Sequence, residues 1–448
     1  MLSKDKSAAA VERLVERAVR AGADSADALY SGGRSTGVQV RLGELDHVSR
    51  SESEDIGLRV FLGARSASVA SSDLSNSALD ELVSRALAMA AEAPEDPFAG
   101  LAPRDLLAGP PFPDLDLVDS AEPDPQRLRQ LALEAERAAL AVPGVKNSGG
   151  SGANESASTL ALATSAGFSG TYSGTARGCA VSVVAGDGAG MQRDSWSHSV
   201  RHGEELEPPE HIGLEAGRRA VARLNPVRPK SGKMPVLFDS RMSASLLGHF
   251  AGVISGAAIA RKSSFLEGRL GQRIFASGVA IIDDPLRPRG LRSRPFDSEG
   301  LGVDRCSIVS NGVLETWMAE SASARQLGIT PTGHAARGVG SPPGVTPSNF
   351  YMEAGKRSRD ELFAAFPEAL LVTELIGQGV NPVTGDYSRG AAGFLIRGGE
   401  IAEPVQEITI ASNLVEMFAT LEPASDLEFR RGIDAPTILV PEMSVGSA

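Results

Sequence analysis

The apolar stretch from Ser245 to Ile259 constrains the fold of this chain more than any other segment. Its larger apolar residues recur three or four positions apart, which predicts a helix; they are Leu246, Leu247, Phe250, Ile254 and Ala257. Gly248, Gly252 and Gly256 fall every fourth residue, so one face of this helix carries almost no side chain. Glycine in a helix interior costs about 0.5–1 kcal/mol relative to alanine. The three glycines therefore predict that another element packs very close to the helix backbone.

Length and charge limit the classes of protein that this chain can belong to. A chain of 448 residues exceeds one ordinary core, so we expect two or three domains. A hydrophobic fraction of 42% with 22% charged residues is typical of a folded, soluble protein. The 49 glycines and the low aromatic content favour strands and turns. The net charge of −12 would repel a phosphate backbone, which argues against a nucleic-acid partner.

Cysteine usage and hydropathy indicate the compartment. Cys179 and Cys306 cannot form a disulfide framework, so we expect a reducing cytoplasm, with both residues buried as small apolar side chains. Near the N-terminus, apolar residues alternate with Glu and Arg over 11–19, which predicts an amphipathic helix rather than a signal peptide. The longest apolar run, 246–260, is shorter than the roughly 20 residues that a membrane span needs. We therefore expect no membrane-spanning segment.

The first predicted unit covers residues 1–93 and has the order helix, β-meander, helix. A helix over 7–21 should end at Gly22, because glycine is favoured just beyond helix C-termini. A second helix should begin at a cap provided by Asp73 or Ser75. The strands of the meander are expected near 26–30, 36–42, 56–62 and 65–71. The proline-rich residues 94–123 then form an extended or wrapped linker, because proline donates no ladder hydrogen bond.

The second predicted unit, residues 124–224, has a similar plan. Asp124 followed by Pro125 predicts an N-cap and a first-turn proline. Strands are expected within the Ser/Gly/Ala/Thr-rich region 145–202, and a closing helix over 210–224. The shared plan fits an internal repeat, and it fits chance equally well.

The third predicted unit, residues 225–448, is mostly strand and turn after the glycine-faced helix. Asn311-Gly312 between alternating residues predicts a β-hairpin. Ser358 should cap a short helix over 360–366. The expected fold class is α+β: N-terminal α/β units with the helix–β-meander–helix plan, followed by a large, mostly antiparallel β domain.

Two glycine motifs allow a functional and a structural interpretation. The run 33–37 matches the G-x-S-x-G nucleophile elbow, which requires a strand before it and a helix after it. Strand-like sequence flanks it on both sides, so a hairpin turn is the favoured interpretation. The run 186–190 follows a strand, but no helix comes after it, which argues against a dinucleotide loop.

Histidines and paired carboxylates are candidate metal ligands. His198 and His202 could chelate a metal on a helix, but their surroundings favour a strand and ordinary hydrogen-bonded histidines. The pairs Asp283-Asp284 and Asp297/Glu299 could hold a hard cation, whereas Asp before proline is also a common turn former.

His249 is the only titratable residue in the run 245–259, and any reaction centre is expected there first. A zinc-hydroxide mechanism needs three protein ligands and a carboxylate base. No Glu lies beside His249 and no second His follows within two turns. The helix therefore offers at most one ligand, and a lone histidine of this kind is more often a core or interface residue.

Eleven further stretches complete the pattern: 264–271, 283–285, 295–300, 321–325, 332–333, 348–349, 377–386, 393–394, 398–401, 404–405 and 409–414. Together they resemble the TldD/PmbA family, and within it the PmbA (TldE) branch, over nearly the whole chain. The resemblance implies a cytoplasmic peptidase system whose TldD-like members carry an H-E-x-x-x-H helix and a distant cysteine as the zinc site. Those members cut unfolded or extended peptides inside a closed chamber, and TldE-like members pair with them. The complex matures peptide antibiotics and degrades unfolded antitoxins.

Carried over position by position, the zinc motif is not present in this chain. The H-E-x-x-x-H positions fall on 248–253, where Gly248 and Val253 occupy the histidine positions and His249 occupies that of the glutamate. The region matching the distant cysteine is Gly377-Gln378-Gly379. The resemblance then implies no catalytic residue, metal ligand or cofactor in this chain, with zinc expected in a TldD-like partner. The glycine face would line or close a chamber.

The leading hypothesis is a subunit that shapes this chamber and holds an extended peptide, for which addition to a sheet edge is one mode. It would form a heterodimer with a TldD-like protein, or a homodimer. The candidate substrate-binding residues are His249, His334, Gly377, Gln378 and Gly379. One alternative is a self-sufficient hydrolase that uses His249 or His334 with Asp283, Asp284 or Glu374. Another is a homodimeric, non-catalytic peptide-binding module.

Overall fold

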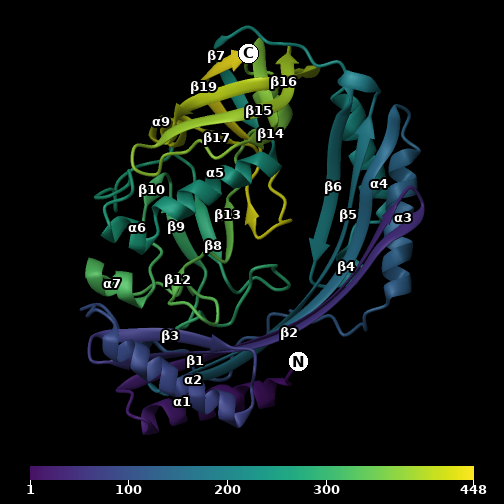
Figure 1. Ribbon diagram of the computed structural model, residues 1–448. Coiled ribbons are helices and arrows are strands. Elements are labelled where there is room, and N and C mark those ends of the chain that lie inside the picture. The colour runs from purple at the N-terminus through teal and green to yellow at the C-terminus, as the bar shows by residue number, and fades with distance from the viewer. Residues whose placement is uncertain (448) are drawn as a thin grey trace.

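The first half of the chain forms one six-stranded antiparallel sheet that curves like an arch (Figure 1). The computed structural model describes residues 1–447, and the strand order in this sheet is β3-β2-β1-β4-β5-β6. The strands are β1 (Ser25–Arg41), β2 (Glu44–Leu62), β3 (Arg65–Ser71), β4 (Val145–Thr164), β5 (Ser169–Ala185) and β6 (Gln192–Val200). The convex side carries α1 (Lys4–Arg20), α2 (Asn76–Glu92), α3 (Pro125–Leu140) and α4 (Pro209–Ala222). Both N-terminal units share this sheet because β1 pairs with β4.

The helix boundaries follow the predicted caps. The Ser75 side chain accepts a hydrogen bond from the backbone N–H of Ala78, and Asp124 accepts one from Gln126 with Pro125 in the first turn. Gly22 takes a φ of +112° just after α1, in the region that favours glycine. α1 begins earlier than predicted because Ser3 provides its N-cap.

The predicted turn at Gly33–Gly37 is wrong. These residues lie in the middle of β1, where Gly33 pairs with Ser53 of β2 on one side and with Ser158 of β4 on the other. The two short strands expected at 26–30 and 36–42 are one strand, since pairing on both edges outweighs the local turn preference of Gly and Ser. No helix follows the motif, so it is not a nucleophile elbow.

The proline-rich linker runs along the C-terminal domain and also bonds to the arch, where Thr175 N–H of β5 donates to Leu117 O. Apart from the 3-10 turn η1 (Arg104–Leu106), it has no regular structure within the described residues. Its backbone bonds to the C-terminal domain, where Ala108 N–H donates to Gly300 O at 2.8 Å. Arg325 holds the linker further upstream by donating to the carbonyls of Phe98 and Leu101.

The C-terminal domain contains a sheet that closes on itself. Its order is β16-β15-β14-β7-β19-β17, and a further pairing of β16 with β19 completes the closure. The strands are β7 (Gly232–Phe238), β14 (Glu368–Ile376), β15 (Asp386–Arg397), β16 (Glu400–Asn413), β17 (Glu422–Pro423) and β19 (Ile438–Ser447). All pairs are antiparallel except β7 with β14. The fold is thus α+β with a large, mostly antiparallel C-terminal domain, as the sequence predicts.

A second sheet of order β10-β9-β8-β13-β18 lies beside the first. Its strands are β8 (Ile281–Asp284), β9 (Cys306–Ser310), β10 (Val313–Leu314), β13 (Asn349–Met352) and β18 (Ile433–Asp434); β11 (Ala335–Ala336) and β12 (Gly344–Val345) form a separate pair. The predicted Asn311-Gly312 hairpin is confirmed, because Ser310 pairs with Val313 and both turn residues have positive φ. The remaining helices are α5 (Ser240–Val253), α6 (Gly256–Ala260), α7 (Ser321–Leu327), α8 (Arg359–Phe363) and α9 (Leu414–Thr420). Ser358 caps α8, as predicted.

The single helix expected over 245–259 is two helices, α5 and α6. α5 ends at Val253, and the Ser255 side chain then caps α6 by accepting from Ala258 N–H. The Gly256 N–H donates to Met318 O outside the helix. A serine cap and a tertiary hydrogen bond therefore interrupt a run whose apolar periodicity continues.

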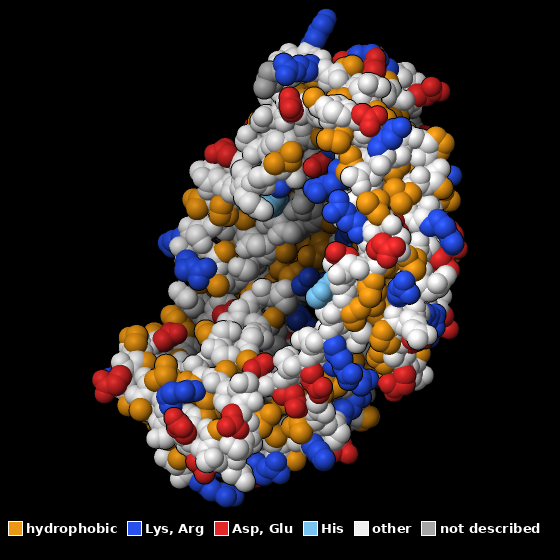
Figure 2. Space-filling view, turned by 45° about the vertical axis from the view of Figure 1, so that its right-hand side comes forward, with side chains coloured by type: hydrophobic (Ala, Val, Ile, Leu, Met, Phe, Trp, Pro, Cys, Tyr) orange, Lys and Arg blue, Asp and Glu red, His pale blue; other side chains and the backbone are white. Residues whose placement is uncertain are grey.

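The arch holds the C-terminal domain at both of its ends. At one end, Asp27 of β1 lies 2.5 Å from Arg337 of the C-terminal domain. Beside it, Gly57 of β2 has no room for a side chain, since an added Cβ would lie 1.6 Å from Val339 O. At the other end, the guanidinium groups of Arg241 and Arg430 lie over the Trp196 ring of β6. A hollow remains between the arch and the domain (Figure 2). Within residues 1–447, no helix is both long and apolar enough to cross a bilayer.

Candidate functional site

The glycine face of α5 is an open surface in this chain. Gly248 and Gly252 are exposed, and a Cβ added to either would meet no atom within 4 Å. Gly256 in α6 is buried, and an added Cβ would lie 2.4 Å from Ser323 Oγ. The prediction of close packing is therefore correct at Gly256 and wrong within this chain at the other two glycines. Two turns of nearly bare helix backbone remain uncovered.

His249 lies beside this open surface and packs against Tyr387 of β15. Its ring meets the Tyr387 ring edge to face, with the centroids 6.3 Å apart. Within the described residues, neither His249 Nε2 nor Tyr387 Oη has a hydrogen-bond partner, although both atoms are buried. Burial lowers the pKa of His249, and the positive charge of Arg389 lowers it further. A neutral imidazole and a neutral phenol therefore meet here with free hydrogen-bonding capacity.

The candidate substrate-binding residues 377–379 form a loop next to the same strand. It connects β14 with β15 and is exposed. Ser388 N–H donates to Gly379 O at 2.7 Å, and Arg389 Nε donates to Ile376 O at 3.4 Å. Because Tyr387 and Arg389 flank Ser388 on β15, the strand connects this loop to His249. Gly379 must be glycine, since an added Cβ would lie 1.8 Å from Ser388 O.

His334 lies apart from this group, in a buried polar network. Its side chain is 2% exposed, with Nε2 3.3 Å from Asp283 Oδ2 and Nδ1 2.8 Å from Thr332 Oγ1. Asp283 also accepts hydrogen bonds from the backbone N–H and the hydroxyl of Ser348. The network joins β8, the start of β13 and the segment before β11. The role of His334 in substrate contact stays a prediction.

The other carboxylates singled out in the sequence have structural partners. Asp297 accepts backbone N–H bonds from Glu299, Leu301 and Ala335, and burial with the nearby Glu299 raises its pKa to about 6. Asp284 Oδ1 accepts from the backbone N–H of Leu286, as expected of a turn former. In the part of the chain that the structure describes, no three His, Cys, Asp or Glu side chains gather as a metal-binding group.

The paired histidines are hydrogen-bonded, as the favoured interpretation held. His198 Nδ1 accepts from the backbone N–H of Glu207, and His202 Nε2 lies 2.9 Å from Asp116 O. They do not share one strand, because β6 ends at Val200. Burial raises the pKa of both cysteine thiols to about 12; Cys179 is buried, as expected, and Cys306 is only partly buried.

Sequence reasoning missed a group of arginines at the end of β6. They are Arg201, Arg287, Arg289, Arg430 and Arg431, and they line one pocket. A run of four arginines over 287–294, in a chain of net charge −12, was the available indication. Only the fold shows that three separate segments meet there.

Solved structures share this fold over its whole length. A Bacteroides thetaiotaomicron protein, suggested as a modulator of DNA gyrase, has a TM-score of 0.92 at 24% identity and covers 100% of both chains. TldE from Thermococcus kodakarensis has a TM-score of 0.87 at 20% identity, covering 98% of this chain and 100% of that protein. The fold is therefore that of a TldE-type protein.

Sequence comparison goes further than the fold. Models of the PmbA/TldA metallopeptidase match here: domain 1 over residues 26–90, the central domain over 118–224 and the C-terminal domain over 231–447. The metalloprotease PmbA of Escherichia coli O157:H7 is 37% identical over 424 residues, which is 94% of this chain and 92% of the relative. This chain belongs to the PmbA/TldD family, and it is a metalloprotease-like protein.

Proposed function

We propose that this chain is a PmbA/TldE-like subunit of a TldD/TldE-type zinc metallopeptidase complex. It shapes part of the chamber and holds an unfolded or extended peptide, while a TldD-like partner supplies the zinc, its ligands and the general base. Support comes from the family, from the TldE-type fold and from the metalloprotease name of the E. coli relative.

The single observation that carries the proposal is the chemistry of α5. At the positions where TldD-like members hold zinc, Gly248 offers a hydrogen atom and Val253 a buried isopropyl group. His249 occupies the glutamate position, and the loop 377–379 offers no thiolate. Zinc sites in proteins use Cys, His, Asp or Glu ligands, so the residues present do not fit a zinc ion. No chemical step is therefore assigned to a metal in this chain.

The residues that remain suit peptide holding. An extended peptide in the hollow exposes one N–H and one C=O per residue, and each needs a partner once water is excluded. His249 Nε2 and Tyr387 Oη have unused hydrogen-bonding capacity beside the open glycine face. The exposed loop 377–379 adds backbone groups at the same place. These groups can bind a peptide backbone without selecting its side chains.

The test is cleavage of an unstructured peptide by purified components. The isolated chain should be inactive, and addition of a TldD-like partner should produce cleavage that a zinc chelator abolishes. A His249→Phe variant, which keeps an aromatic ring but removes the ring nitrogens, should raise KM in the complex. Zinc-dependent cleavage by the isolated chain would sink the assignment.

The same experiment separates the two alternatives. A self-sufficient hydrolase using His249 needs a group that orients the imidazole, yet the charge that acts on His249 is the cation Arg389. Cleavage by the isolated chain that His249→Ala abolishes would nevertheless favour it. A homodimeric binding module would bind peptide and give no cleavage with any TldD-like partner.

A further inference from the structure

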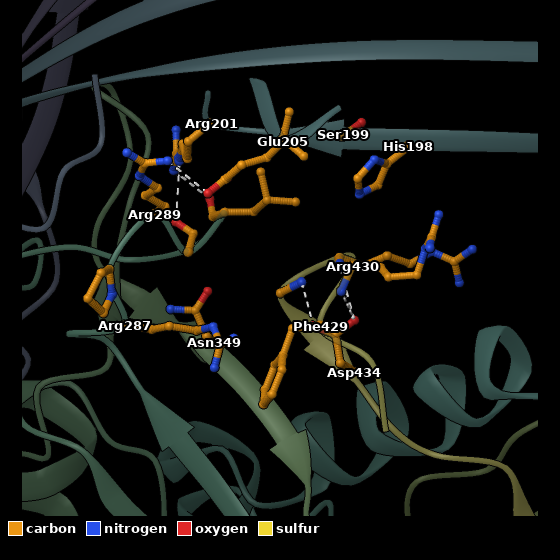
Figure 3. A pocket seen from close by; sticks show the side chains of 16 residues that line it. His198, Ser199, Arg201, Glu205, Arg287, Arg289, Asn349, Phe429, Arg430 and Asp434 are labelled. Carbon is orange, nitrogen blue, oxygen red and sulfur yellow. Dashed lines mark hydrogen bonds and ion pairs between the residues drawn. The ribbon is translucent and has the colours of Figure 1, made fainter. Parts of the chain in front are cut away.

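A pocket of about 180 Å³ lies where the arch meets the C-terminal domain (Figure 3). Its lining comes from parts of the chain that are distant in the sequence: residues 198–201 and Glu205 at the end of β6, the segment 287–291 before β9, Asn349 of β13, and residues 429–434 up to β18. Arg201, Glu205 and Arg289 lie together on one side of it, and Phe429 and Arg430 lie on the opposite side. None of these residues belongs to the α5 surface.

Arginines outnumber carboxylates among the residues that line the pocket. Five arginines line it, against the two carboxylates Glu205 and Asp434. Asp434 is already satisfied, because its oxygens accept the backbone N–H groups of Arg430, Arg431 and Gly432. Those three bonds hold the arginine-bearing segment in place. This concentration of cations is unusual in a chain of net charge −12.

Two of the arginines have carboxylate partners. Arg289 has three: its Nη1 lies 2.8 Å from Glu204 and 2.9 Å from Glu205, and its Nε lies 2.6 Å from Asp116. Arg430 has two, because its Nη1 lies 2.7 Å from Glu207 and 3.5 Å from Glu428. Arg430 Nη2 is buried and has no hydrogen-bond partner within residues 1–447.

The other three arginines have no carboxylate within ion-pair distance in the described part of the chain. Arg201 donates only to the backbone carbonyls of Thr175, Gly290 and Leu291. The Arg287 guanidinium lies over the Phe429 ring, 3.5 Å from its centroid. Arg431 Nη1 donates to the backbone carbonyl of Arg241 at 3.3 Å. Carbonyl dipoles and an aromatic face orient these groups but leave their charge uncompensated.

A strand edge leads to the pocket. β6 is the last strand of the arch sheet and pairs only with β5. No backbone hydrogen bond joins its outer edge to another element among the residues that the structure describes. His198 Nδ1 is an acceptor, so the neutral ring carries its hydrogen on Nε2 and can donate at the pocket. An extended peptide can add to such an edge through its backbone.

We propose that this pocket binds a carboxylate, and that the carboxylate is the C-terminal group of an extended peptide lying parallel to β6. A parallel direction brings the end of the peptide to the end of β6, where the arginines are. Guanidinium groups bind carboxylates in a planar, two-pronged geometry with charge-assisted hydrogen bonds. The inference rests on the proposed role in peptide holding. It adds a site, separate from α5, that recognises the C-terminal end of the peptide.

The test measures binding of a fluorescent, unstructured peptide to the isolated chain by anisotropy. Three versions are compared: a free acid, its C-terminal amide, and an amide whose last residue is aspartate. Loss of hydrogen bonds to a charged group should weaken binding of the amide by about tenfold or more. Binding of the aspartyl amide as tightly as the free acid would assign the site to any terminal carboxylate. Failure of the aspartyl amide would assign it to the main-chain carboxylate alone.

Variants locate the effect. Arg287→Gln should weaken binding of the free acid about tenfold and leave binding of the amide unchanged. Arg431→Gln, at an exposed residue, is the second variant should the first alter the melting temperature. The matched control is Arg20→Gln on α1, which removes the same charge at an exposed site and should change neither peptide.

Equal binding of acid and amide to the unchanged protein would overturn the proposal. So would an equal loss for both peptides in Arg287→Gln, or stronger competition by inorganic phosphate than by acetate at matched ionic strength. These results are independent of the partner. If acid and amide bind equally while the reconstituted complex still cleaves peptide, the proposed carboxylate site is refuted and the proposed complex is not. If the acid binds more tightly than the amide but no cleavage occurs with a TldD-like partner, the proposed complex is refuted and the carboxylate site is not.

Discussion

At the scale of single residues, the charge next to His249 decides what that histidine can do. A general base needs a pKa near the working pH, and it is usually oriented by a carboxylate. Here burial and the cation Arg389 both act against protonation. The imidazole therefore stays neutral near pH 7, as a hydrogen-bonding group beside Tyr387.

We expect the pKa of His249 to lie below 6.5 in the folded chain. Arg389→Gln should raise it, because a nearby cation disfavours the charged imidazolium. Nuclear magnetic resonance titration of the imidazole measures both values, with His249→Asn identifying the resonance. A pKa above 6.5, or no change in Arg389→Gln, would contradict this account.

The lowered pKa also sets the sign of a pH dependence. The unfolded chain binds a proton near pH 6.5 while the folded chain resists it, so His249 costs stability as the pH falls below 6.5. His198 has a lowered pKa for a similar reason, burial, and acts in the same direction. The free energy of unfolding of His249→Asn should therefore decline less between pH 7 and pH 5.5 than that of the unchanged chain. Urea titrations at the two pH values provide the comparison.

At the scale of elements, the two exposed glycines of α5 allow the stability of the isolated chain to be distinguished from close packing in a complex. Alanine at Gly248 or Gly252 meets nothing within 4 Å, so the isolated chain should keep its stability or gain up to about 1 kcal/mol. Gly256→Ala is the control: it forces a Cβ against Ser323 and should cost about 1–3 kcal/mol.

If a partner or the substrate covers the open face, the double variant Gly248→Ala/Gly252→Ala should lower activity in the reconstituted complex while the melting temperature holds. The double variant is measured beside the unchanged chain for melting temperature, partner binding and peptide cleavage. Full activity of the double variant would show that nothing packs closely against α5 in the complex.

The elements that depend on local chemistry could be predicted from the sequence, and those that depend on pairing could not. Ser75, Asp124 and Ser358 cap helices because a side-chain oxygen reaches a free N–H two or three residues ahead. The turn predicted at 33–37 was wrong because turn preference is a local property, whereas β1 pairs with strands that include β4, which is far along the chain. The break between α5 and α6 was missed for the same reason, since Met318 accepts the Gly256 N–H.

The candidate site divides in the same way. His249 was singled out from the apolar run and residues 377–379 from the resemblance; β15 connects them in the structure, and their contact with a substrate stays a prediction. Tyr387 and Arg389 were not predicted, because only the register of β15 brings them to α5 and to the loop. The arginine pocket needs three segments to meet, which no single window of sequence can show.

At the scale of the whole molecule, polar contacts that use arginine join the arch to the C-terminal domain at both of its ends. Burial alone would raise the pKa of Asp27, but Arg337 and Arg59 hold it below its usual value. At the opposite end, Asp194 of β6 lies 3.8 Å from Arg241 of α5.

Asp27→Asn tests how much the first of these contacts contributes. Arg59 and Arg337 are both nearly fully buried, and the substitution removes the carboxylate that they share, leaving Glu299, 3.8 Å from Arg59, as the remaining buried carboxylate. Breaking a buried ion pair from one side costs about 3–5 kcal/mol, because the remaining charge is desolvated and uncompensated. The exposed pair of Lys233 and Glu442 is the control, where Glu442→Gln should cost no more than about 1 kcal/mol. Urea unfolding followed by circular dichroism measures both.

Because Asp27 belongs to the sheet and Arg337 to the C-terminal domain, we also expect the unfolding transition to broaden or divide in Asp27→Asn relative to the unchanged chain. Equal losses in the two variants would mean that the close contact between Gly57 and the Val339 backbone holds this end of the arch without the ion pair.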